Sequence, residues 1–502
     1  MTATHKLLYV IVIIFLTRMS GLLGVSVERI SSAYKRILFV LILLSAIVAH
    51  IPVISNPGFY NHDEWQKYDH IKEFGFRDFA AAYGKITPGP EFGYPVRPVS
   101  FLEQGFASIN MMDFPWVSHL IDVSIHLSSG FLFCFLLLKV TKNLRFSIIA
   151  LIAFLVSPLS IYSTAWLGAS VDRVYTFWGL LAALCVYYFC YGKYKAIYLI
   201  GVCCFLGIAL LSKETALMLP AVLLVLACYL SFQQSGQFLN NRSLYVLAVF
   251  LGLPALAYLI YRIPALMVTL HGGGVSTYTP SLSNLPINAL YYFSYPFMYQ
   301  ATDMVSIAVQ GEKYVWFGVF VHAALVGCLV YCYGALRGLL YLGFYFVFLV
   351  PVLMLPQPGA HYLYASTIPF ALLLAGLWCK TSPMTTMRGF AGKFVLAGIL
   401  LLVFWRFYQI EHFFYVEGVC QRNTIVTLNA RIESERSNGN SIKEILIVAD
   451  PGAKGYVAKK VFFARERMGD YKGIKFIYSP SEISVAPEHL LSTNMSTGCL
   501  VY

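Results

Sequence analysis

Charged residues are scarce in this sequence. They make up 12% of its 502 residues, about half the share found in an average soluble domain, while hydrophobic residues make up 58% and the mean hydropathy is +0.68. This balance excludes a soluble globular protein and indicates a polytopic membrane protein. The 35 tyrosines and 38 phenylalanines fit the interfacial and lipid-facing surface of such a protein.

Several other signals are missing as well. The eleven cysteines are scattered, and no CxxC pair or Cys/His cluster has zinc spacing. Only Cys420 and Cys499 lie in the polar C-terminal part, where they could form a disulfide if that part is extracytoplasmic. No cleavable signal peptide is evident, because the apolar run 7–25 has no small-residue cleavage site and Arg18 interrupts it. This run could span the membrane or lie in its interface.

What the sequence does hold is a series of apolar runs that can cross a membrane as helices. A spanning helix needs about 20 apolar residues, or about 17 at the short end. The candidate spans are residues 37–55, 116–140, 147–163, 174–192, 196–212, 215–232, 244–267, 315–336, 338–355, 363–379 and 394–409. With the run 7–25 as a possible further span, we expect an all-α polytopic membrane protein with about 11–12 transmembrane helices.

Lysine and arginine set the orientation of these spans. Cytoplasmic loops carry an excess of both residues, and four basic groups fall on one side if the spans alternate. The groups are Arg29 with Lys35 and Arg36, Lys139 with Lys142 and Arg145, Lys193 with Lys195, and Lys380 with Arg388 and Lys393. The long loop 56–115 and the C-terminus then lie outside the cytoplasm. Because the net charge of +12 sits mainly in the short basic loops, it does not indicate nucleic-acid binding.

One further apolar segment, 285–309, conflicts with this orientation if it is counted as a span. It contains Pro286 and Pro296, with a polar stretch at 300–303. We therefore expect it to be interfacial or re-entrant on the outer face. An ordinary span with weak topology signals is the alternative.

The polar parts of the chain predict local structure of their own. In the first outer loop, residues 65–74 and 77–83 are expected as short amphipathic helices on the membrane surface. Near the C-terminus, residues 444–449 and 474–478 alternate like strands around a basic helix at 455–468. This order predicts a small βαβ-like domain.

The chain therefore divides into three parts. Residues 1–36 form an N-terminal apolar segment and a cytoplasmic basic loop. Residues 37–410 form the transmembrane domain, which includes the large outer loop 56–115. Residues 411–502 form a small soluble α/β domain outside the cytoplasm.

The outer loop opens with an acidic pair, Asp63 and Glu64. Adjacent carboxylates beside a membrane exit are costly unless they serve a purpose. A carboxylate can take the proton of a hydroxyl during glycosyl transfer, and two neighbouring carboxylates can hold a divalent cation. The alternative is a helix start, because acidic residues are favourable in the first turn.

Arg97 lies at the end of the same loop, in the sequence Arg-Pro-Val-Ser. The planar guanidinium makes two hydrogen bonds to phosphate oxygens, so Arg97 is a candidate phosphate ligand. A snorkelling interfacial arginine is the alternative.

Further candidate phosphate ligands flank apolar runs at the outer face. They are Arg173, Lys213 and His361. Asp172 precedes Arg173 and Glu214 follows Lys213, so each dipeptide could instead be a local ion pair.

His119 and His126 lie seven residues apart on the second candidate span and therefore share a helix face, with Asp122 between them. Ionisable residues in a span usually face the protein interior or a cavity. These three side chains could bind a metal, but nothing completes the ligand set, and polar packing is favoured.

Several of these stretches, in this order, resemble motifs of the GT-C membrane glycosyltransferases. Residues 61–64 look like the acidic motif of the first loop. The other stretches resemble motifs of the transmembrane tetratricopeptide-repeat O-mannosyltransferases: Arg97-Pro98-Val99-Ser100 with His119 and His126, Ser157-Pro158 with Asp172-Arg173, Ser212-Lys213-Glu214, and Ala360-His361-Tyr362-Leu363-Tyr364 with His in place of Arg. The resemblance covers roughly residues 37 to 380.

The repeats of that family are absent from this chain. The chain length and the short outer tail look more like the bacterial and phage-encoded enzymes that decorate O-antigen with glucose. This similarity implies a bacterial inner-membrane protein with its active site on the periplasmic face.

The resemblance implies a GT-C-like fold and an inverting transfer of a sugar from a polyprenyl-phosphate carrier to a glycan. Asp63 would deprotonate the acceptor hydroxyl, and Glu64 would support it. The groups implied to hold the donor phosphate are Arg97, Arg173, Lys213 and His361, with His119, His126, Asp172 and Glu214 in possible supporting roles. No cofactor is certain, and a divalent cation is possible.

Other functions stay open from the residues alone. A transporter or flippase for lipid-linked sugars also fits many spans, although the charges collect at one face and no inverted repeat is visible. A protein O-glycosyltransferase is a further alternative. A ligase that moves a whole polymer is a third, against which the early acidic pair argues.

Overall fold

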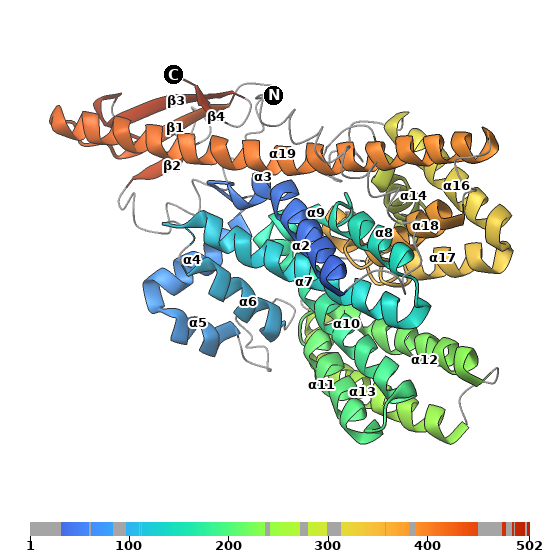
Figure 1. Cartoon of the computed structure of the whole chain (residues 1–502). Coiled ribbons are helices and arrows are strands. Elements are labelled where there is room, and N and C mark those ends of the chain that lie inside the picture. The colour runs from blue at the N-terminus through green and yellow to red at the C-terminus, as the bar shows by residue number, and fades with distance from the viewer. Residues whose placement is uncertain are drawn as a thin grey trace.

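The computed structural model shows a mostly helical membrane protein with one small sheet near the C-terminus (Figure 1). It describes residues 32–59, 62–83, 97–109, 111, 113–235, 241–271, 280–298, 313–356, 358–380, 387–449, 474–477, 484–485, 487–496 and 499–501. The run 7–25 lies outside the described residues. The expected fold class, an all-α membrane protein with a small α/β unit, is confirmed.

Each of the eleven expected spans falls on a helix. These helices are α2 (Ser32–Ala49), α7 (Pro115–Thr141), α8 (Leu144–Leu155), α10 (Ser170–Tyr191), α11 (Lys195–Leu210), α12 (Leu219–Ser235), α13 (Asn241–His271), α16 (Lys313–Tyr333), α17 (Ala335–Val347), α18 (Thr367–Lys380) and α19 (Met387–Ser437). Within the described residues, six helices are long and apolar enough to cross a membrane, and five more are shorter apolar helices. The chain is therefore a multi-pass membrane protein.

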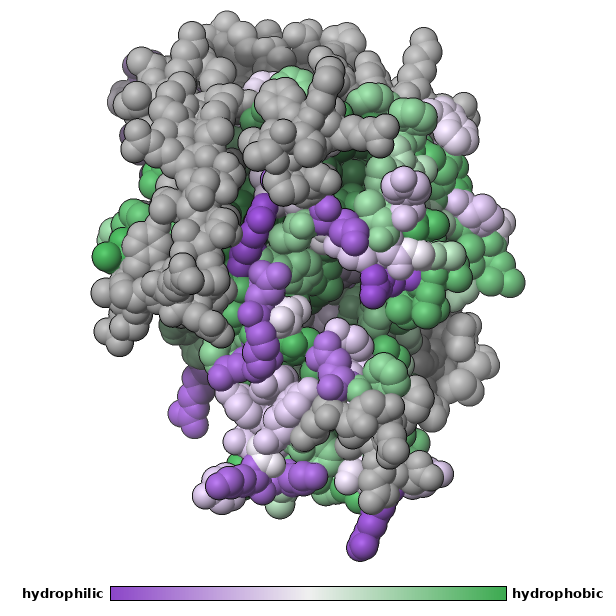
Figure 2. Space-filling view, turned by 45° about the vertical axis from the view of Figure 1, so that its right-hand side comes forward, coloured by the Kyte–Doolittle hydropathy of each residue, from purple (hydrophilic) through white to green (hydrophobic). Residues whose placement is uncertain are grey.

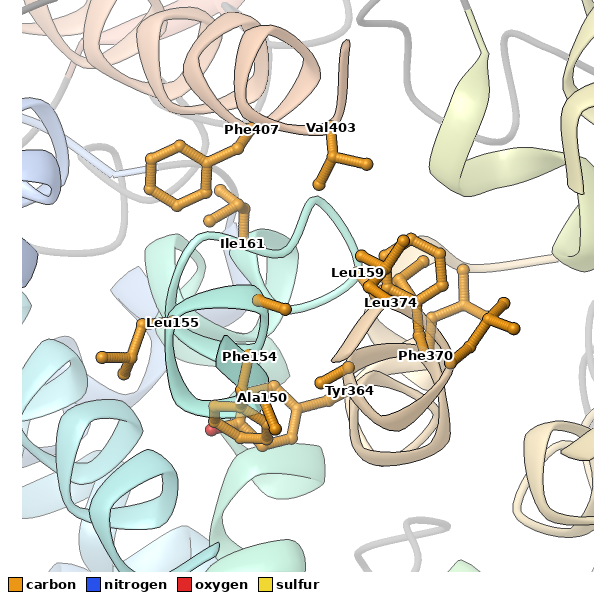
Figure 3. Close-up of a cluster of buried hydrophobic side chains, with 14 of the residues drawn as sticks. Ala150, Phe154, Leu155, Leu159, Ile161, Tyr364, Phe370, Leu374, Val403 and Phe407 are labelled. Atoms are coloured by element: carbon orange, nitrogen blue, oxygen red, sulfur yellow. The ribbon is translucent and has the colours of Figure 1, made fainter. Parts of the chain in front are cut away.

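Apolar side chains both fill the interior and cover much of the described surface (Figure 2). Phe320 and Leu336, for example, are 73% and 71% exposed, as expected of side chains that face lipid. Inside, Phe154 of α8 lies beside Tyr364, and Ile161 faces Phe407 of α19 (Figure 3). The core thus joins α8, α18 and α19 around the loop that follows α8.

The loop after α8 takes up the second half of the segment 147–163, which was expected to be one continuous span. Helix α8 ends at Leu155, because Pro158 cannot continue a helix, and the short helix α9 (Ile161–Ala165) and the 3-10 turn η2 (Leu167–Ala169) follow. Non-helical backbone at membrane depth has to be enclosed by protein. The carbonyl oxygens of Leu155 and Ser163 are consequently buried and accept hydrogen bonds from side chains of other helices.

The first outer loop forms three short helices, α4 (His62–Phe74), α5 (Phe76–Tyr83) and α6 (Pro98–Ser108), which lie together in Figure 1. The first two match the expected surface helices. Gly75 separates them in the left-handed region, with φ of +84°. The buried ring of Phe79 occupies the space where a Cβ on Gly105 would lie, so α5 packs closely on α6.

The segment 285–309 begins with a helix too short to span. Helix α14 (Leu285–Ser294) has 10 residues, which rise about 15 Å, and the 3-10 turn η6 (Tyr295–Phe297) follows it. The hydrocarbon core is about 30 Å thick. The described part therefore agrees with the expected interfacial or re-entrant segment, while residues 299–309 lie outside the described residues.

Helix α19 continues past the expected boundary at residue 410. It has 51 residues and rises about 76 Å, more than twice the thickness of the hydrocarbon core. No proline interrupts the sequence after the last span, so the helix continues to Ser437. Residues 411–437 are therefore a helical extension of the membrane span, and it carries the sheet (Figure 1).

The sheet has four strands in the order β2-β1-β3-β4, namely β1 (Glu444–Ala449), β2 (Lys475–Ile477), β3 (Leu490–Ser496) and β4 (Cys499–Val501). Strand β1 pairs in parallel with β2 and β3, and β4 pairs antiparallel with β3. The first strand has the expected bounds, and the parallel β1–β2 pair fits a βαβ connection. The expected helix 455–468 lies outside the described residues.

Cys420 on α19 is disulfide-bonded, whereas nine other cysteines are free thiols. Strand β4, which begins at Cys499, packs against α19. The side chain of Cys499 lies outside the described residues, so its pairing with Cys420 stays a prediction. A disulfide in this extension fits the expected extracytoplasmic side, because disulfides persist in oxidising compartments.

Candidate active site

Two ion pairs connect three separate segments at the outer ends of the helices. The Arg97 side chain donates from Nε to Glu214 Oε2 at 2.9 Å and from Nη2 to the other oxygen of the same carboxylate. Lys213 Nζ donates to Asp172 Oδ2 at 2.5 Å. The structure thus brings together four residues that the sequence singled out. It also corrects the alternative of local pairs, because each cation holds a carboxylate from another segment.

Backbone contacts fix this arrangement. Lys213 and Glu214 lie at the start of the 3-10 turn η3 (Glu214–Met218), immediately after α11, while Arg97 precedes α6. Ser100 Oγ donates to the Ser212 carbonyl at 3.0 Å, and the Val99 amide donates to the Leu211 carbonyl at 3.3 Å. The Arg-Pro-Val-Ser and Ser-Lys-Glu motifs are therefore docked on each other.

Arg173 has a different environment. It is fully buried, and Nη2 donates to Asp122 Oδ1 at 2.5 Å and to Glu103 Oε1 at 3.1 Å, while Nη1 donates to the Ser163 carbonyl at 2.6 Å. Two carboxylates and a carbonyl already engage both Nη atoms of this guanidinium, while the buried Nε has no hydrogen-bond partner among the described residues. Arg173 therefore holds helices together and is a poor candidate for the donor phosphate. Asp122 is correspondingly an ion-pair partner of Arg173.

His361 lies beside the two ion pairs, in the 3-10 turn η7 (Ala360–Leu363). Its ring is 5.2 Å from the ring of Trp166 and 4.0 Å from that of Tyr362, and Lys213 Nζ lies 4.3 Å from the centre of the Tyr362 ring. Burial, and then the charges of Lys213 and Arg97, hold the pKa of His361 well below its usual value. His361 is therefore a neutral ring at neutral pH, unlike the arginine whose place it takes in the motif.

Lys213 is also affected by its surroundings. Burial lowers the pKa of its ammonium group, and nearby Arg97 lowers it as well, whereas Asp172 opposes both effects. The partner carboxylate thus helps to keep Lys213 charged in a place that disfavours charge.

Sequence reasoning missed two residues of this region, Tyr258 and Arg262 on α13. The buried Tyr258 side chain is within electrostatic range of Glu214, Arg262 and Arg97. Arg262 has a buried Nη1 atom with no hydrogen-bond partner in the part of the chain that the structure describes. The available signal was a lone arginine near the outer end of the span 244–267.

The acidic pair lies in the first turn of α4, which begins at His62. The side chains of Asp63 and Glu64 lie outside the described residues, so their roles stay predictions. The helix-start alternative is consistent with this placement of the backbone.

The loop that leads to this pair is firmly held. His119 donates from Nε2 to the Gly58 carbonyl at 3.0 Å and stacks on Phe59 at 5.1 Å. Gly58 also packs against Gly418 of α19 so closely that a Cβ on Gly58 would lie 2.5 Å from the Gly418 oxygen. His119 is therefore a positioning residue of the loop root.

His126 belongs to a second polar cluster, which is sealed inside the protein. His126 and His50 both donate from Nε2 to the Leu155 carbonyl at 3.2 Å. The other ring nitrogen of His126 lies 2.9 Å from the Tyr364 hydroxyl, and that of His50 lies 2.5 Å from Glu411 Oε1. His119 and His126 thus have separate partners, and no group of three metal-ligating side chains occurs among the described residues.

Comparisons with known proteins give structural likenesses alone. No family model matches, and no curated protein sequence matches. The chain is similar to the apo structure of ArnT from Cupriavidus metallidurans, with 12% identity and a TM-score of 0.45 over 92% of this chain and 90% of that one. It is also similar to the archaeal oligosaccharyltransferase AglB from Archaeoglobus fulgidus, solved with an inhibitory peptide and a dolichol-phosphate, with 11% identity and a TM-score of 0.44 over 90% of this chain and 65% of that one.

With identities of 12% and 11% and TM-scores below 0.5, these likenesses assign neither a family nor residue roles to this chain.

Proposed function

We propose that this chain is an inverting glycosyltransferase that moves a sugar, glucose, from a polyprenyl-phosphate carrier to a glycan acceptor such as lipopolysaccharide O-antigen. The protein would lie in a bacterial inner membrane, with its active site on the periplasmic face. The observation that carries the proposal is the group of ion pairs Arg97–Glu214 and Lys213–Asp172 at the outer ends of the helices, beside the aromatic rings of Tyr362 and Trp166.

The charge of this group suits a sugar phosphodiester. The two ion pairs are neutral as a set, and Arg262 adds one positive charge near them. A polyprenyl-phosphate sugar carries one negative charge on its phosphodiester. Its phosphate can take over hydrogen bonds from Glu214, because this carboxylate and its partner Arg97 are partly exposed, with 34% and 20% of their side-chain surfaces accessible.

The same cations suit the leaving group. In the proposed transfer, the bond between the sugar carbon and the phosphate oxygen breaks while the acceptor oxygen forms a new bond from the opposite face. The acceptor proton goes to Asp63. The departing phosphate monoester gains negative charge, which Arg97 and Lys213 stabilise as the bond breaks. Asp63 with Glu64 could also hold a divalent cation.

Asp63 provides the sharpest test. Asp63→Asn keeps the size and much of the hydrogen bonding of the side chain but cannot accept a proton at neutral pH. We expect sugar transfer from a polyprenyl-phosphate donor, measured in proteoliposomes, to fall by about 10²–10⁴ while donor binding stays near normal. Glu64→Gln should be milder.

Asp78 supplies a matched control, because it is exposed and lies in the first turn of the neighbouring helix α5. Asp78→Asn should change stability by about 0.3–1 kcal/mol and leave transfer intact. Equal and small effects of Asp63→Asn, Glu64→Gln and Asp78→Asn would show that the pair is only a helix start, and the proposed mechanism would then be wrong.

A further inference from the structure

A buried arginine in the last membrane span has no acidic partner among the residues that the structure describes. Arg406 of α19 lies between Val403 and Phe407, whose side chains point toward Ile161 of α9 (Figure 3). The residue is 1% exposed. None of its three guanidinium nitrogens has a hydrogen-bond partner in the described part of the chain.

One tyrosine ring lies over this guanidinium, and a second tyrosine lies near the first. The guanidinium lies 5.5 Å from the centre of the Tyr295 ring, which is itself 6.5 Å from the Tyr162 ring. Tyr295 and Tyr162 are also the ionisable side chains that interact with it electrostatically. A ring face attracts a cation but does not replace the hydrogen bonds that an arginine loses on leaving water. The five donor hydrogens of the guanidinium are therefore still available to an anion.

The position of Arg406 in the span indicates which anion can reach it. The expected span ends at Gln409, three residues beyond Arg406, so Arg406 lies about 5 Å inside the outer end of that span. The phosphates of membrane lipids lie in the headgroup layer at this boundary of the hydrocarbon core. An anionic lipid can therefore bring its phosphate close to the level of Arg406.

We propose that Arg406, with Tyr295 and Tyr162, forms a binding site for a lipid phosphate, separate from the ion-pair cluster. The guanidinium would make two parallel hydrogen bonds to phosphate oxygens, as arginine does with phosphate in general. The lipid is either a polyprenyl phosphate or a diacyl phospholipid, which share this group. The site is independent of the proposed transfer, since it needs only an anionic lipid.

The short helix α9 connects this site to the ion-pair region. Tyr162 interacts electrostatically with Arg406. The next residue, Ser163, accepts a hydrogen bond from Arg173 through its carbonyl and donates one from its hydroxyl to the His361 carbonyl at 2.9 Å. The short helix α9 would therefore lie between His361 and a lipid phosphate bound at Arg406.

Thermal unfolding of the purified, delipidated full chain tests the proposal. Polyprenyl monophosphate, phosphatidylglycerol and inorganic phosphate are added separately to the wild type, Arg406→Met and Arg406→Lys. We expect at least one of the two lipids to raise the unfolding temperature of the wild type, and inorganic phosphate to have no effect. The same lipid should bind Arg406→Met at least tenfold more weakly, and Arg406→Lys should be intermediate. The lipid that acts identifies the source of the phosphate.

A second measurement separates a lipid site from a structural role. Without lipid, Arg406→Met should unfold at the same temperature as the wild type or higher, because it removes a buried charge that has no partner. Arg337→Met is the control, since Arg337 also stacks on a tyrosine, 5.1 Å from the Tyr333 ring, but is exposed. The proposal is overturned if neither lipid stabilises the wild type, if Arg406→Met responds like the wild type, or if Arg406→Met alone unfolds at a lower temperature.

Discussion

The two polar clusters of this protein differ in access. The outer cluster consists of the ion pairs Arg97–Glu214 and Lys213–Asp172. The Arg97 and Glu214 side chains are 20% and 34% exposed, whereas Lys213 and Asp172 behind them are each 1% exposed. In the inner cluster, His50 and Glu411 are both 0% exposed, although their nitrogen and oxygen lie 2.5 Å apart. Both clusters join distant parts of the chain, but of these pairs only Arg97–Glu214 is accessible enough to exchange a partner directly for a ligand.

The two clusters also differ in the kind of hydrogen-bond partner that they contain. The outer cluster pairs full charges, arginine and lysine with carboxylates, and such pairs can re-form with a phosphate. The inner cluster is built on one backbone carbonyl, that of Leu155, to which His50 and His126 both donate. A backbone carbonyl is fixed in place and cannot be displaced by a ligand as a carboxylate side chain can. We infer that the outer cluster serves binding and the inner cluster serves to hold α2, α7 and α19 together.

The stretch 360–364 contributes residues to both clusters. His361 and Tyr362 of the stretch 360–364 lie in the outer cluster, whereas Tyr364 hydrogen-bonds His126 in the inner one. The 3-10 turn η7 lets neighbouring residues point in these two directions. A substitution in this stretch can therefore act on binding or on stability, depending on the residue.

Among changes to these two clusters, breaking an ion pair of the outer cluster should have the largest effect. Lys213→Met removes a charge-assisted contact to the donor phosphate and leaves Asp172 buried and unpaired. We expect donor use to fall about tenfold to a hundredfold and the free energy of unfolding to fall by about 3–5 kcal/mol. Transfer kinetics and chemical denaturation measure the two effects.

The double variant Lys213→Met/Asp172→Asn distinguishes them. It removes both charges, so stability should largely return while donor use stays low. Recovery of both properties would place Lys213 among purely structural residues.

Breaking the inner cluster should affect stability alone. Glu411→Gln weakens the contact to His50, and the free energy of unfolding should fall by about 1.5–3 kcal/mol, as for other hydrogen bonds to a charged group. The transfer rate and donor KM of the folded protein should not change. Glu433→Gln, an exposed position on the same helix, is the control and should be neutral. A raised donor KM in Glu411→Gln would contradict the division between the clusters.

Much of this fold could be predicted from the sequence, because apolar length and basic loops determine membrane spans locally. Strand β1 was likewise predicted with its bounds from alternation alone. The structure departs from these predictions at two places, and each departure has a local cause. Pro158 ends α8 early, and the lack of any proline lets α19 continue far beyond residue 410.

The site was predicted only as a set of residue types. Arg97 and Glu214 are 117 positions apart, and His50 and Glu411 are 361 apart, so their pairing depends on how the helices pack. Sequence placed Arg173 with the phosphate ligands, but its carboxylate partners come from α6 and α7. Arg262 and Tyr258 carried no motif and emerged only from the packing of α13.

The smallest effect is expected for a substitution of His361. It tests whether the His361 ring adds a further positive charge to the outer cluster. The pKa of His361 lies well below its usual value, so the ring is neutral at pH 7.5 and gives the donor phosphate no charge. His361→Gln should then leave donor KM within about threefold at this pH, since a neutral hydrogen bond contributes about 1 kcal/mol or less here. A tenfold rise in donor KM would mean that His361 is protonated when the donor binds.

The pH dependence of the free energy of unfolding tests whether the pKa of His361 is lowered in the folded protein. Because burial lowers the pKa of His361 in the folded protein, the unfolded chain takes up more protons below about pH 6.5. The contribution of the neutral His361 ring to the free energy of unfolding is therefore fully present above about pH 6.5. It is lost as the pH falls toward the lower pKa that His361 has in the folded protein. Unfolding measured from pH 7.5 to 5.5 should therefore show a steeper loss for the wild type than for His361→Gln. Parallel curves would contradict a buried, neutral His361, and with it the view that Arg97, Lys213 and Arg262 supply the positive charge of the outer cluster.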